Sequence, residues 1–276
     1  MVSEVTFDRF KHFTRVGVGL PRGGSARFLI DTGIGITVVS TSLKERYDLE
    51  ESGETFRGRR MSGQEVEAPL LNLPPLTLGT HCFDGHIGAA LDLTEEGEGQ
   101  EFDGILGLDV LGQLPLTINP FDNTVVLGQL PPEIVEPETV SHVVAARVHR
   151  DGPSVDLRVD LRLPDKTVVE VEVDTGSAVT ILDTSLMPAC SVQGTEDGAR
   201  IMEGIDETGH AFVRTLVPLP GAVCLSQAPA TALRQPTVMF QDLALNGLIG
   251  TEYLDRYIQT YNTRAGTITL RERVKY

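Results

Sequence analysis

Two aspartates stand in the same short sequence, once at Asp31-Thr32-Gly33 and again at Asp174-Thr175-Gly176. Two carboxyl groups held within hydrogen-bond distance do not both ionise readily, so such a pair shares one proton and titrates in two separate steps. In mild acid one aspartate is then an acid and its partner a base. The base can take a proton from a water held between the two, while the acid protonates an amide carbonyl. The pattern therefore predicts amide hydrolysis without a covalent intermediate, a metal or another cofactor.

The two copies lie 143 residues apart (174 − 31 = 143), and the same offset relates other parts of the chain. It relates residues 37–43 to residues 180–186, and it relates Gly104-Ile105-Leu106-Gly107 to Gly247-Leu248-Ile249-Gly250. A single register without a net gap is difficult to obtain by chance. The chain therefore reads as two copies of one unit, each of which contributes one aspartate.

Each aspartate directly follows a predicted apolar strand, residues 26–30 in the first unit and 168–173 in the second. The glycine after each Asp-Thr pair allows a sharp turn and leaves backbone N–H groups facing the carboxylate. Polar, turn-forming residues near Gly63 and near Gly209 predict the tips of two exposed hairpins. The aspartates are thus expected in loops, with a hairpin available to each unit.

The whole chain is predicted to be all-β, in two lobes with one short helix each after Gly107 and Gly250. The first lobe covers residues 1–128 and the second covers residues 142–276. Residues 129–141 are rich in proline and glutamate and are expected to form the linker.

Three further local elements are predicted in the first lobe. Residues 41–46 begin with Thr and Ser, which favour helix N-termini, so a short helix is expected there. The polar residues 1–10 can pair as an extra strand. The acidic, glycine-containing residues 94–101 indicate a surface loop.

The formal net charge of −16 argues against functions that depend on basic surfaces. Nucleic acids and anionic membranes are bound through Lys and Arg, so neither is an expected partner. No stretch has the pattern of a signal peptide or the length of a membrane helix. The three cysteines are an odd number without C-x-x-C spacing, which is typical of reduced thiols. We therefore expect a cytoplasmic protein.

The paired features resemble the retropepsin-like and pepsin-like aspartic proteases. The residues that carry the resemblance are Phe28-Leu29-Ile30-Asp31-Thr32-Gly33 with Ile105-Leu106-Gly107, and Val171-Glu172-Val173-Asp174-Thr175-Gly176-Ser177 with Leu248-Ile249-Gly250. The resemblance implies the acid-protease fold, in which two pseudo-twofold-related lobes form a retropepsin dimer fused into a single chain. It also implies an aspartic endopeptidase that acts on peptides or proteins as a monomer and needs no cofactor.

The resemblance further implies roles for single residues. Asp31 and Asp174 are the implied catalytic dyad, and Thr32 and Thr175 are the implied pair that interlocks the two loops. The remaining implied positions are Gly63 and Gly209 at the tips of two flaps over the substrate, and Gly33, Gly176 and Ser177 as support of the active-site loops.

Two features depart from the pattern of these proteases. Ile34 follows the first Asp-Thr-Gly, where Ser, Thr or Ala is usual, whereas Ser177 follows the second. A hydroxyl at this position can donate a hydrogen bond to its aspartate, so the difference predicts that Asp174 ionises more readily than Asp31. Neither hairpin segment contains the tyrosine typical of pepsin-like flaps, which favours the retropepsin type.

Two other interpretations of the repeated unit stay open. The same fold could serve as a catalytically inactive peptide-binding or regulatory module, which would tolerate loss of either aspartate. Alternatively, each half could use its own aspartate in a larger oligomer, which a fully active monomer would exclude.

Several other polar residues are expected to have structural roles. Residues 81–86 contain two histidines, a cysteine and an aspartate, but their spacing fits no standard zinc pattern and indicates a surface turn. A serine triad built on Ser177 is not expected, since no histidine lies in either repeated core. Asp103, Asp109 and Glu252 near the glycine motifs are interpreted as solvated or capping charges.

Overall fold

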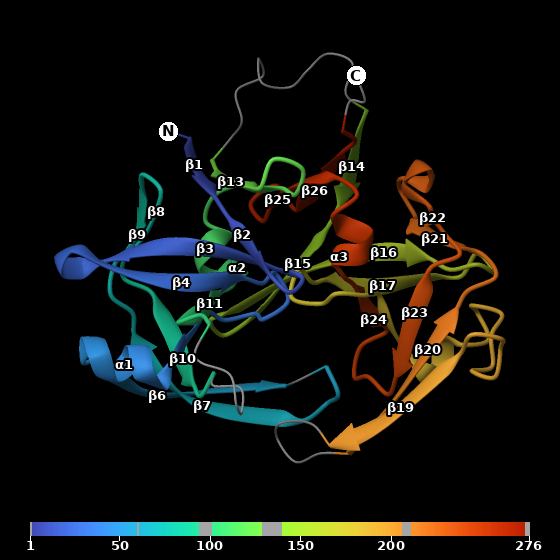
Figure 1. Cartoon of the computed structure of the whole chain (residues 1–276), viewed down its shortest axis with the longest axis horizontal. Helices are drawn as coiled ribbons and strands as arrows, with labels where there is room; N and C mark the ends of the chain where they lie inside the picture. Colours follow the sequence, from blue (N-terminus) through green and yellow to red (C-terminus); the bar gives the residue numbers. More distant parts are fainter. Residues whose placement is uncertain (1, 60, 94–100, 129–139, 206–210, 274–276) are drawn as a thin grey trace.

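The structure is a computed structural model of the chain and describes residues 2–59, 61–93, 101–128, 140–205 and 211–273. These residues form three β-sheets and three short α-helices, so the predicted all-β class is confirmed. The N-terminal half occupies one side of the molecule and the C-terminal half the other, with both chain ends at the same edge (Figure 1).

The two largest sheets, one in each half, have the same strand order. The first runs β6-β7-β10-β5-β11-β4-β3-β8-β9, with β2 paired to β3; the second runs β19-β20-β23-β18-β24-β17-β16-β21-β22, with β15 paired to β16. The strands of the first sheet are β2 (Asp8–Phe10), β3 (Phe13–Leu20), β4 (Gly24–Ile30), β5 (Val38–Ser40), β6 (Glu51–Arg59), β7 (Glu65–Asn72), β8 (Leu76–Leu78), β9 (His81–Phe83), β10 (Ile87–Leu91) and β11 (Gly104–Leu106). Those of the second are β15 (Arg147–Asp151), β16 (Ser154–Arg162), β17 (Val168–Val173), β18 (Ile181–Asp183), β19 (Arg200–Ile205), β20 (Ala211–Pro218), β21 (Ala222–Leu225), β22 (Leu233–Arg234), β23 (Thr237–Gln241) and β24 (Gly247–Ile249).

The third sheet takes strands from both halves and joins them in the order β1-β13-β12-β25-β26-β14. Its strands are β1 (Ser3–Thr6), β12 (Leu116–Asn119), β13 (Thr124–Leu127), β14 (Ser141–Ala145), β25 (Ile258–Asn262) and β26 (Thr267–Arg271). The helices are α1 (Thr41–Tyr47), α2 (Leu108–Leu111) and α3 (Thr251–Leu254).

A pseudo-twofold axis passes through this shared sheet. Thr117 of β12 lies directly opposite Thr260 of β25, and their hydroxyl oxygens are 2.9 Å apart. These threonines are 143 residues apart in the sequence, the same offset that separates the two aspartates. A residue can meet its own counterpart only at a symmetry axis, so the contact locates the axis between β12 and β25.

One hydrophobic core extends through both lobes and consists mainly of aliphatic side chains. It contains Ile30 at the end of β4 and Val173 at the end of β17, both fully buried. Burying such a side chain stabilises the fold by roughly 1.5–3 kcal/mol. The two strands that lead into the aspartates are therefore anchored in the hydrophobic core.

The predicted short helices are present. The Ser40 hydroxyl accepts a hydrogen bond from Leu43 N–H at 3.1 Å and caps α1, as the sequence predicted. Helices α2 and α3 begin directly after Gly107 and Gly250. The polar N-terminal segment pairs as an extra strand, β1, against β13.

Two predicted loops fall mainly outside the described residues. The acidic loop at 94–101 is described only at Glu101, and of the linker at 129–141 only residues 140 and 141 are described. Strand β14 already starts at Ser141, the last residue assigned to the linker. In the described part of the chain, no helix has the length and apolar character needed to span a membrane.

The Thr117–Thr260 contact can be tested by a double-mutant cycle. We expect Thr117→Val and Thr260→Val each to lower the free energy of unfolding by about 1 kcal/mol, because each removes one hydroxyl of the pair. The double substitution should cost less than the sum of the two, with a coupling of about 0.5–1.5 kcal/mol. Urea denaturation of the four proteins measures this coupling, and strictly additive losses would contradict it.

Candidate active site

Each aspartate lies at the end of the strand predicted to carry it, and a parallel neighbouring strand holds its backbone. Strand β11 runs parallel to β4, and Asp31 N–H donates to the Leu106 carbonyl at 3.0 Å. Strand β24 runs parallel to β17, and Asp174 N–H donates to the Ile249 carbonyl at 3.1 Å. The two repeated glycine motifs therefore provide the strands that fix the aspartates.

Thr32 and Thr175 bind each other's loops across the axis. Thr32 N–H donates to Thr175 Oγ1 and Thr175 N–H donates to Thr32 Oγ1, each over 3.0 Å. Each hydroxyl in turn donates to the opposite lobe, Thr32 to the Val173 carbonyl at 2.7 Å and Thr175 to the Ile30 carbonyl at 3.3 Å. Both threonines are buried, so losing one partner would leave the other unsatisfied away from water.

The glycine of each loop packs against the aspartate of the other lobe. A Cβ atom on Gly33 would lie 2.6 Å from Asp174 Cγ, and one on Gly176 would lie 2.5 Å from Asp31 Cγ. No side chain fits at these distances, so the closeness of the dyad itself requires glycine at both positions. The glycine N–H groups also donate to the carboxylates of their own loops, Gly33 to Asp31 at 2.8 Å and Gly176 to Asp174 at 2.7 Å.

The carboxyl groups of Asp31 and Asp174 hydrogen-bond to each other. Both are partly accessible but largely desolvated, and desolvation raises the pKa of each above its ordinary value. The negative charge of Asp31 raises the pKa of Asp174 further, to well above that value. The pair therefore shares one proton, and Asp174 is the partner that retains it.

The order of ionisation predicted from the sequence is wrong. The Ser177 hydroxyl donates to the Val179 carbonyl at 2.9 Å rather than to the neighbouring aspartate. Asp31 instead accepts backbone hydrogen bonds from both Gly33 and Ile34, which lower its pKa. These donors belong to the backbone, so they favour ionised Asp31 whatever side chain stands at position 34.

Ile34 has a packing role. Its side chain contacts a second apolar cluster that contains Ile36, Val38 and the β7 residues Ala68 and Leu70. An apolar residue after the first Asp-Thr-Gly therefore connects the first aspartate loop to the β6–β7 hairpin.

A buried network supports the first aspartate loop. Thr37 donates to the Asp109 carboxylate through its hydroxyl at 2.7 Å and its N–H at 2.9 Å, and its hydroxyl accepts from Gly107 N–H at 3.0 Å. Desolvation raises the pKa of Asp109 to about 6, so this half-buried carboxylate is not a solvated charge, although it does lie in the first turn of α2 as a capping charge would. The counterpart of Thr37 is Thr180, whose buried hydroxyl finds no hydrogen-bond partner within the described residues. The counterpart of Asp109 is the exposed Glu252.

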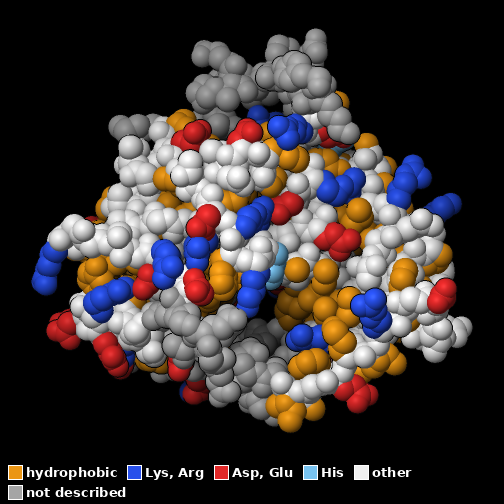
Figure 2. Space-filling view, viewed as in Figure 1, with side chains coloured by type: hydrophobic (Ala, Val, Ile, Leu, Met, Phe, Trp, Pro, Cys, Tyr) orange, Lys and Arg blue, Asp and Glu red, His pale blue; other side chains and the backbone are white. Residues whose placement is uncertain are grey.

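A cleft of about 400 Å³ lies beside the dyad. Its lining combines the tip of the β6–β7 hairpin, the loop after Asp174, and residues of β20 and β23. Phe212 and Arg214 of β20 form part of this wall, with the guanidinium 4.1 Å from the ring centroid. Figure 2 shows a hollow below the centre of this face, with apolar side chains gathered on the side of the C-terminal lobe. Such a mixed lining suits a peptide with both apolar and polar groups.

The β6–β7 hairpin carries the first predicted flap tip. Gly63 lies in its turn with φ of +85°, a conformation that favours glycine. The tip reaches the second lobe, because the Met61 carbonyl accepts a hydrogen bond from Ala244 N–H at 2.7 Å. The second predicted tip, at Gly209, lies outside the described residues, although the hairpin strands β19 and β20 are described and point toward the first hairpin (Figure 1).

Comparison with known proteins agrees with this geometry. Residues 19–110 match the family model described as aspartyl protease. The fold is similar to the crystal structure of the aspartic proteinase from Irpex lacteus, with a TM-score of 0.59 and 12% sequence identity over 99% of this chain and 97% of that chain. The chain is aspartic-protease-like. Its fold is the pepsin-like one over nearly its full length. No curated protein sequence matches the chain.

The site around the two aspartates also contains a histidine that sequence reasoning missed. His12 lies in the turn between β2 and β3, and its Nε2 is 2.8 Å from the Gly176 carbonyl oxygen. Its charge, when protonated, lowers the pKa of Asp31. The offset of 143 could not reveal it, because the counterpart of His12 is Val155.

A third carboxyl group is buried beside the dyad. Glu172 precedes Asp174 by two residues on β17, and only 7% of it is exposed. Its neighbours Val171 and Val173 face the core, so strand alternation points Glu172 to the opposite side of the sheet. Desolvation, followed by the charges of Asp156 and Asp31, raises the pKa of Glu172 to about 8.

The segment with metal-ligand residue types has no metal-site geometry. Residues 81–83 form β9, and the described residues contain no group of three or more His, Cys, Asp and Glu side chains placed to hold a metal ion.

The unequal networks of the two loops predict unequal mutational effects. Thr37→Val should lower the free energy of unfolding by about 1–3 kcal/mol, because it removes the hydroxyl that donates to the Asp109 carboxylate and accepts from Gly107 N–H. The matched change Thr180→Val removes a buried hydroxyl that has no described partner, so stability should stay within about 0.5 kcal/mol or rise. Urea denaturation of both variants measures the difference. Equal losses would mean that the Thr37–Asp109 hydrogen bond does not stabilise the loop.

Glu172 should make the protein less stable as the pH rises. Its pKa is raised in the folded protein, to about 8 from an ordinary 4.5, so the native state holds the proton more tightly than the unfolded chain. This stabilisation is complete below about pH 4.5 and is lost as the pH rises through about 8. Glu172→Gln should therefore be more stable than wild type by roughly a few kcal/mol at pH 9 and not at pH 4.5.

Denaturation of wild type and Glu172→Gln at both pH values measures this difference. Glu45→Gln, on the exposed face of α1, is the control and should follow the wild type. The same pH dependence in all three proteins would contradict a buried, protonated Glu172.

Proposed function

We propose that the protein is an aspartic endopeptidase, in which a water held between Asp31 and Asp174 attacks a peptide carbonyl. The observation that carries the proposal is the dyad: one carboxyl from each lobe, packed against the glycine of the opposite loop and held beside its partner by the reciprocal Thr32–Thr175 hydrogen bonds. The match to the aspartyl protease family and the fold support the same activity.

The unequal surroundings of the two aspartates support a different role for each in this proposal. Ionised Asp31 takes a proton from the water, whose oxygen forms a bond to the carbonyl carbon, while Asp174 donates its proton to the carbonyl oxygen. The resulting tetrahedral diol collapses when Asp31 passes its proton to the amide nitrogen and Asp174 recovers a proton from a diol hydroxyl. The C–N bond breaks, the carboxylic acid and the amine leave, and both aspartates regain their starting protonation.

The substrate in this proposal is an extended peptide that lies in the cleft under the two hairpins. The β6–β7 tip, which contacts Ala244 in the second lobe, has to move for the peptide to enter. The protein acts as a monomer, because one chain contributes both aspartates. Its cytoplasmic location stays a prediction from the sequence.

Cleavage of a mixed peptide library between pH 3 and 7 tests the proposal. We expect Asp31→Asn and Asp174→Asn each to lower the cleavage rate by roughly 10³-fold or more, because each removes one of the two proton-transfer groups. Asp151→Asn, an exposed change in the β15–β16 turn, should leave the rate unchanged. A statine-type transition-state mimic should bind the wild type and bind both dyad variants more weakly.

A peptide-binding module on the same fold would give a different result. The folded wild type would then cleave nothing across the whole pH range, and both dyad variants would keep the wild-type affinity for peptides.

A further inference from the structure

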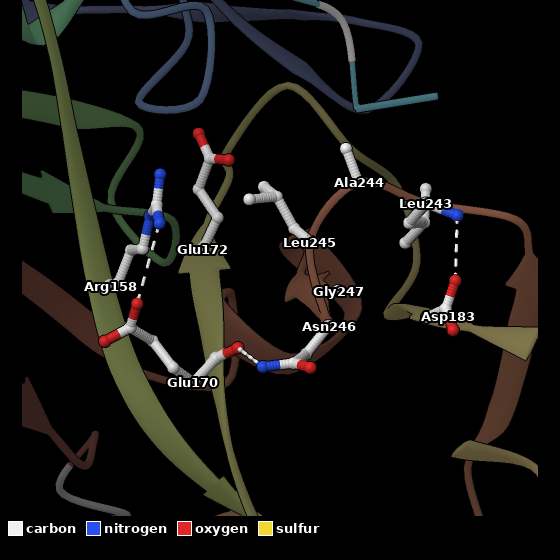
Figure 3. A pocket seen from close by; sticks show the side chains of 9 residues that line it. All are labelled: Arg158, Glu170, Glu172, Asp183, Leu243, Ala244, Leu245, Asn246 and Gly247. Atoms are coloured by element: carbon white, nitrogen blue, oxygen red, sulfur yellow. Dashed lines mark hydrogen bonds and ion pairs between the residues drawn. The ribbon is translucent and has the colours of Figure 1, made fainter. Parts of the chain in front are cut away.

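A second cavity, of about 340 Å³, lies in the second lobe on the Glu172 side of β17. It is open to solvent on one side and is lined by β16, β17, the end of β18 and the loop of residues 243–247. Figure 3 shows the Glu172 side chain between Arg158 and Leu245. Ala244 lines this cavity and also donates to the Met61 carbonyl at the hairpin tip, and Met61 lines the cleft. The cavity and the substrate cleft are therefore neighbours.

The charges around this cavity are not balanced. Arg158 is occupied by Asp156 at 2.9 Å and by Glu170 at 3.6 Å. Glu170 is also paired with Arg147, and Asp183 accepts backbone hydrogen bonds from Ser185 and Leu243. The remaining acid is Glu172, for which the described part of the chain offers no hydrogen bond or ion pair. It is a carboxyl group more than nine-tenths buried that faces a cavity without a partner.

The wall of the cavity is built before any peptide arrives. The loop of residues 243–247 is held by Leu243 N–H, which donates to Asp183 at 2.9 Å, and by the Asn246 amide, which donates to the Glu170 carbonyl at 3.1 Å. Asp183 N–H donates to the Asn246 carbonyl at 2.9 Å. A wall fixed in this way loses little conformational entropy when a ligand binds.

We propose that this cavity is a specificity pocket for a basic side chain, lysine or arginine, next to the peptide bond that is cut, and that Glu172 is its ion-pair partner. The inference rests on the proposed peptidase function. The aliphatic stem of the basic residue would lie on Leu245, and its charged end would reach the buried carboxylate.

The state of Glu172 without a peptide is consistent with this role. Burial and neighbouring negative charges raise its pKa, and the charge of Arg158 offsets only part of this rise. A further cation within about 4–6 Å would favour the ionised carboxylate and lower the pKa again. Binding of a basic side chain would thus offset the free-energy cost of ionising the buried Glu172 carboxyl group.

The pocket would also orient the peptide. The counterpart of Glu172 in the first lobe is Leu29 (172 − 143 = 29), which is apolar and 1% exposed. The corresponding position therefore offers no acid to a basic side chain in the first lobe. A peptide with a basic residue on one side of the cut would bind preferentially in one direction across the pseudo-twofold cleft.

Two fluorogenic peptides that differ only in lysine or norleucine beside the scissile bond test this pocket. Norleucine keeps the carbon chain and lacks the ammonium group. We expect the wild type to prefer the lysine peptide by roughly ten- to a hundredfold in kcat/KM. Glu172→Gln should bring the ratio near one, and Glu172→Leu should reverse it. Both peptides are cut by the same dyad, so the ratio cancels any effect of the substitution on the aspartates.

The control variant Glu45→Gln, far from the cavity on α1, should keep the wild-type ratio. A third peptide with arginine at the same position shows which basic side chain fits better. An unchanged ratio in Glu172→Gln, with cleavage retained, would overturn the pocket and leave the peptidase function standing.

If the folded wild type cleaves neither peptide, the peptidase proposal fails and titration calorimetry decides about the pocket. A lysine preference in affinity that Glu172→Gln loses would support the pocket without catalysis. Equal affinities for the lysine and norleucine peptides would overturn it.

Discussion

The reciprocal hydrogen bonds between Thr32 and Thr175 are the constraint on which the rest of the site depends. Each threonine binds the backbone of the opposite lobe, so neither aspartate loop can shift without breaking buried bonds in both lobes. The dyad distance is thereby set by backbone geometry. That distance in turn leaves no space for a Cβ atom at Gly33 or Gly176. The threonine and the glycine of each Asp-Thr-Gly sequence are thus required by contacts with the opposite lobe, the threonine by its hydrogen bonds and the glycine by the close approach of the opposite aspartate.

The strands that hold the two aspartates are related by the pseudo-twofold axis, but the charges and hydrogen bonds around the two carboxyl groups differ. Asp31 accepts backbone hydrogen bonds from two residues and lies near His12, whereas Asp174 is exposed to the charges of Asp31 and Glu172. Hydrolysis by an activated water needs one acid and one base. The duplicated pattern provides the pair, and the differences between the two halves give its members different electrostatic surroundings.

Contacts between the lobes also tie the cleft to the fold. The shared sheet and the continuous core make the two halves one body, and the Met61–Ala244 hydrogen bond joins the first hairpin to the second lobe. The loop that donates this hydrogen bond, residues 243–247, also forms a wall of the cavity beside Glu172. Opening of the hairpin and access to that cavity therefore involve the same few residues.

The sequence by itself determined the features that repeat. The offset of 143 residues identified both aspartates, both glycine motifs and both short helices, because symmetry-related positions face the same steric demands in each lobe. The sequence also predicted the start of α1 at the Ser40 cap and the hairpin turn at Gly63, because a side-chain acceptor and a positive φ each act within a few residues.

Tertiary structure alone decided the features that do not repeat. The contact of Thr37 with the desolvated Asp109 and the approach of His12 to Gly176 depend on segments far apart in the chain, and the direction of the Ser177 hydroxyl depends on how its loop folds. The same is true of Glu172, which in the sequence is a polar residue of an alternating strand. The ionisation of a carboxyl group depends on its desolvation and on charges that folding brings close. Both are set by residues distant in the chain, so no local sequence pattern predicts them.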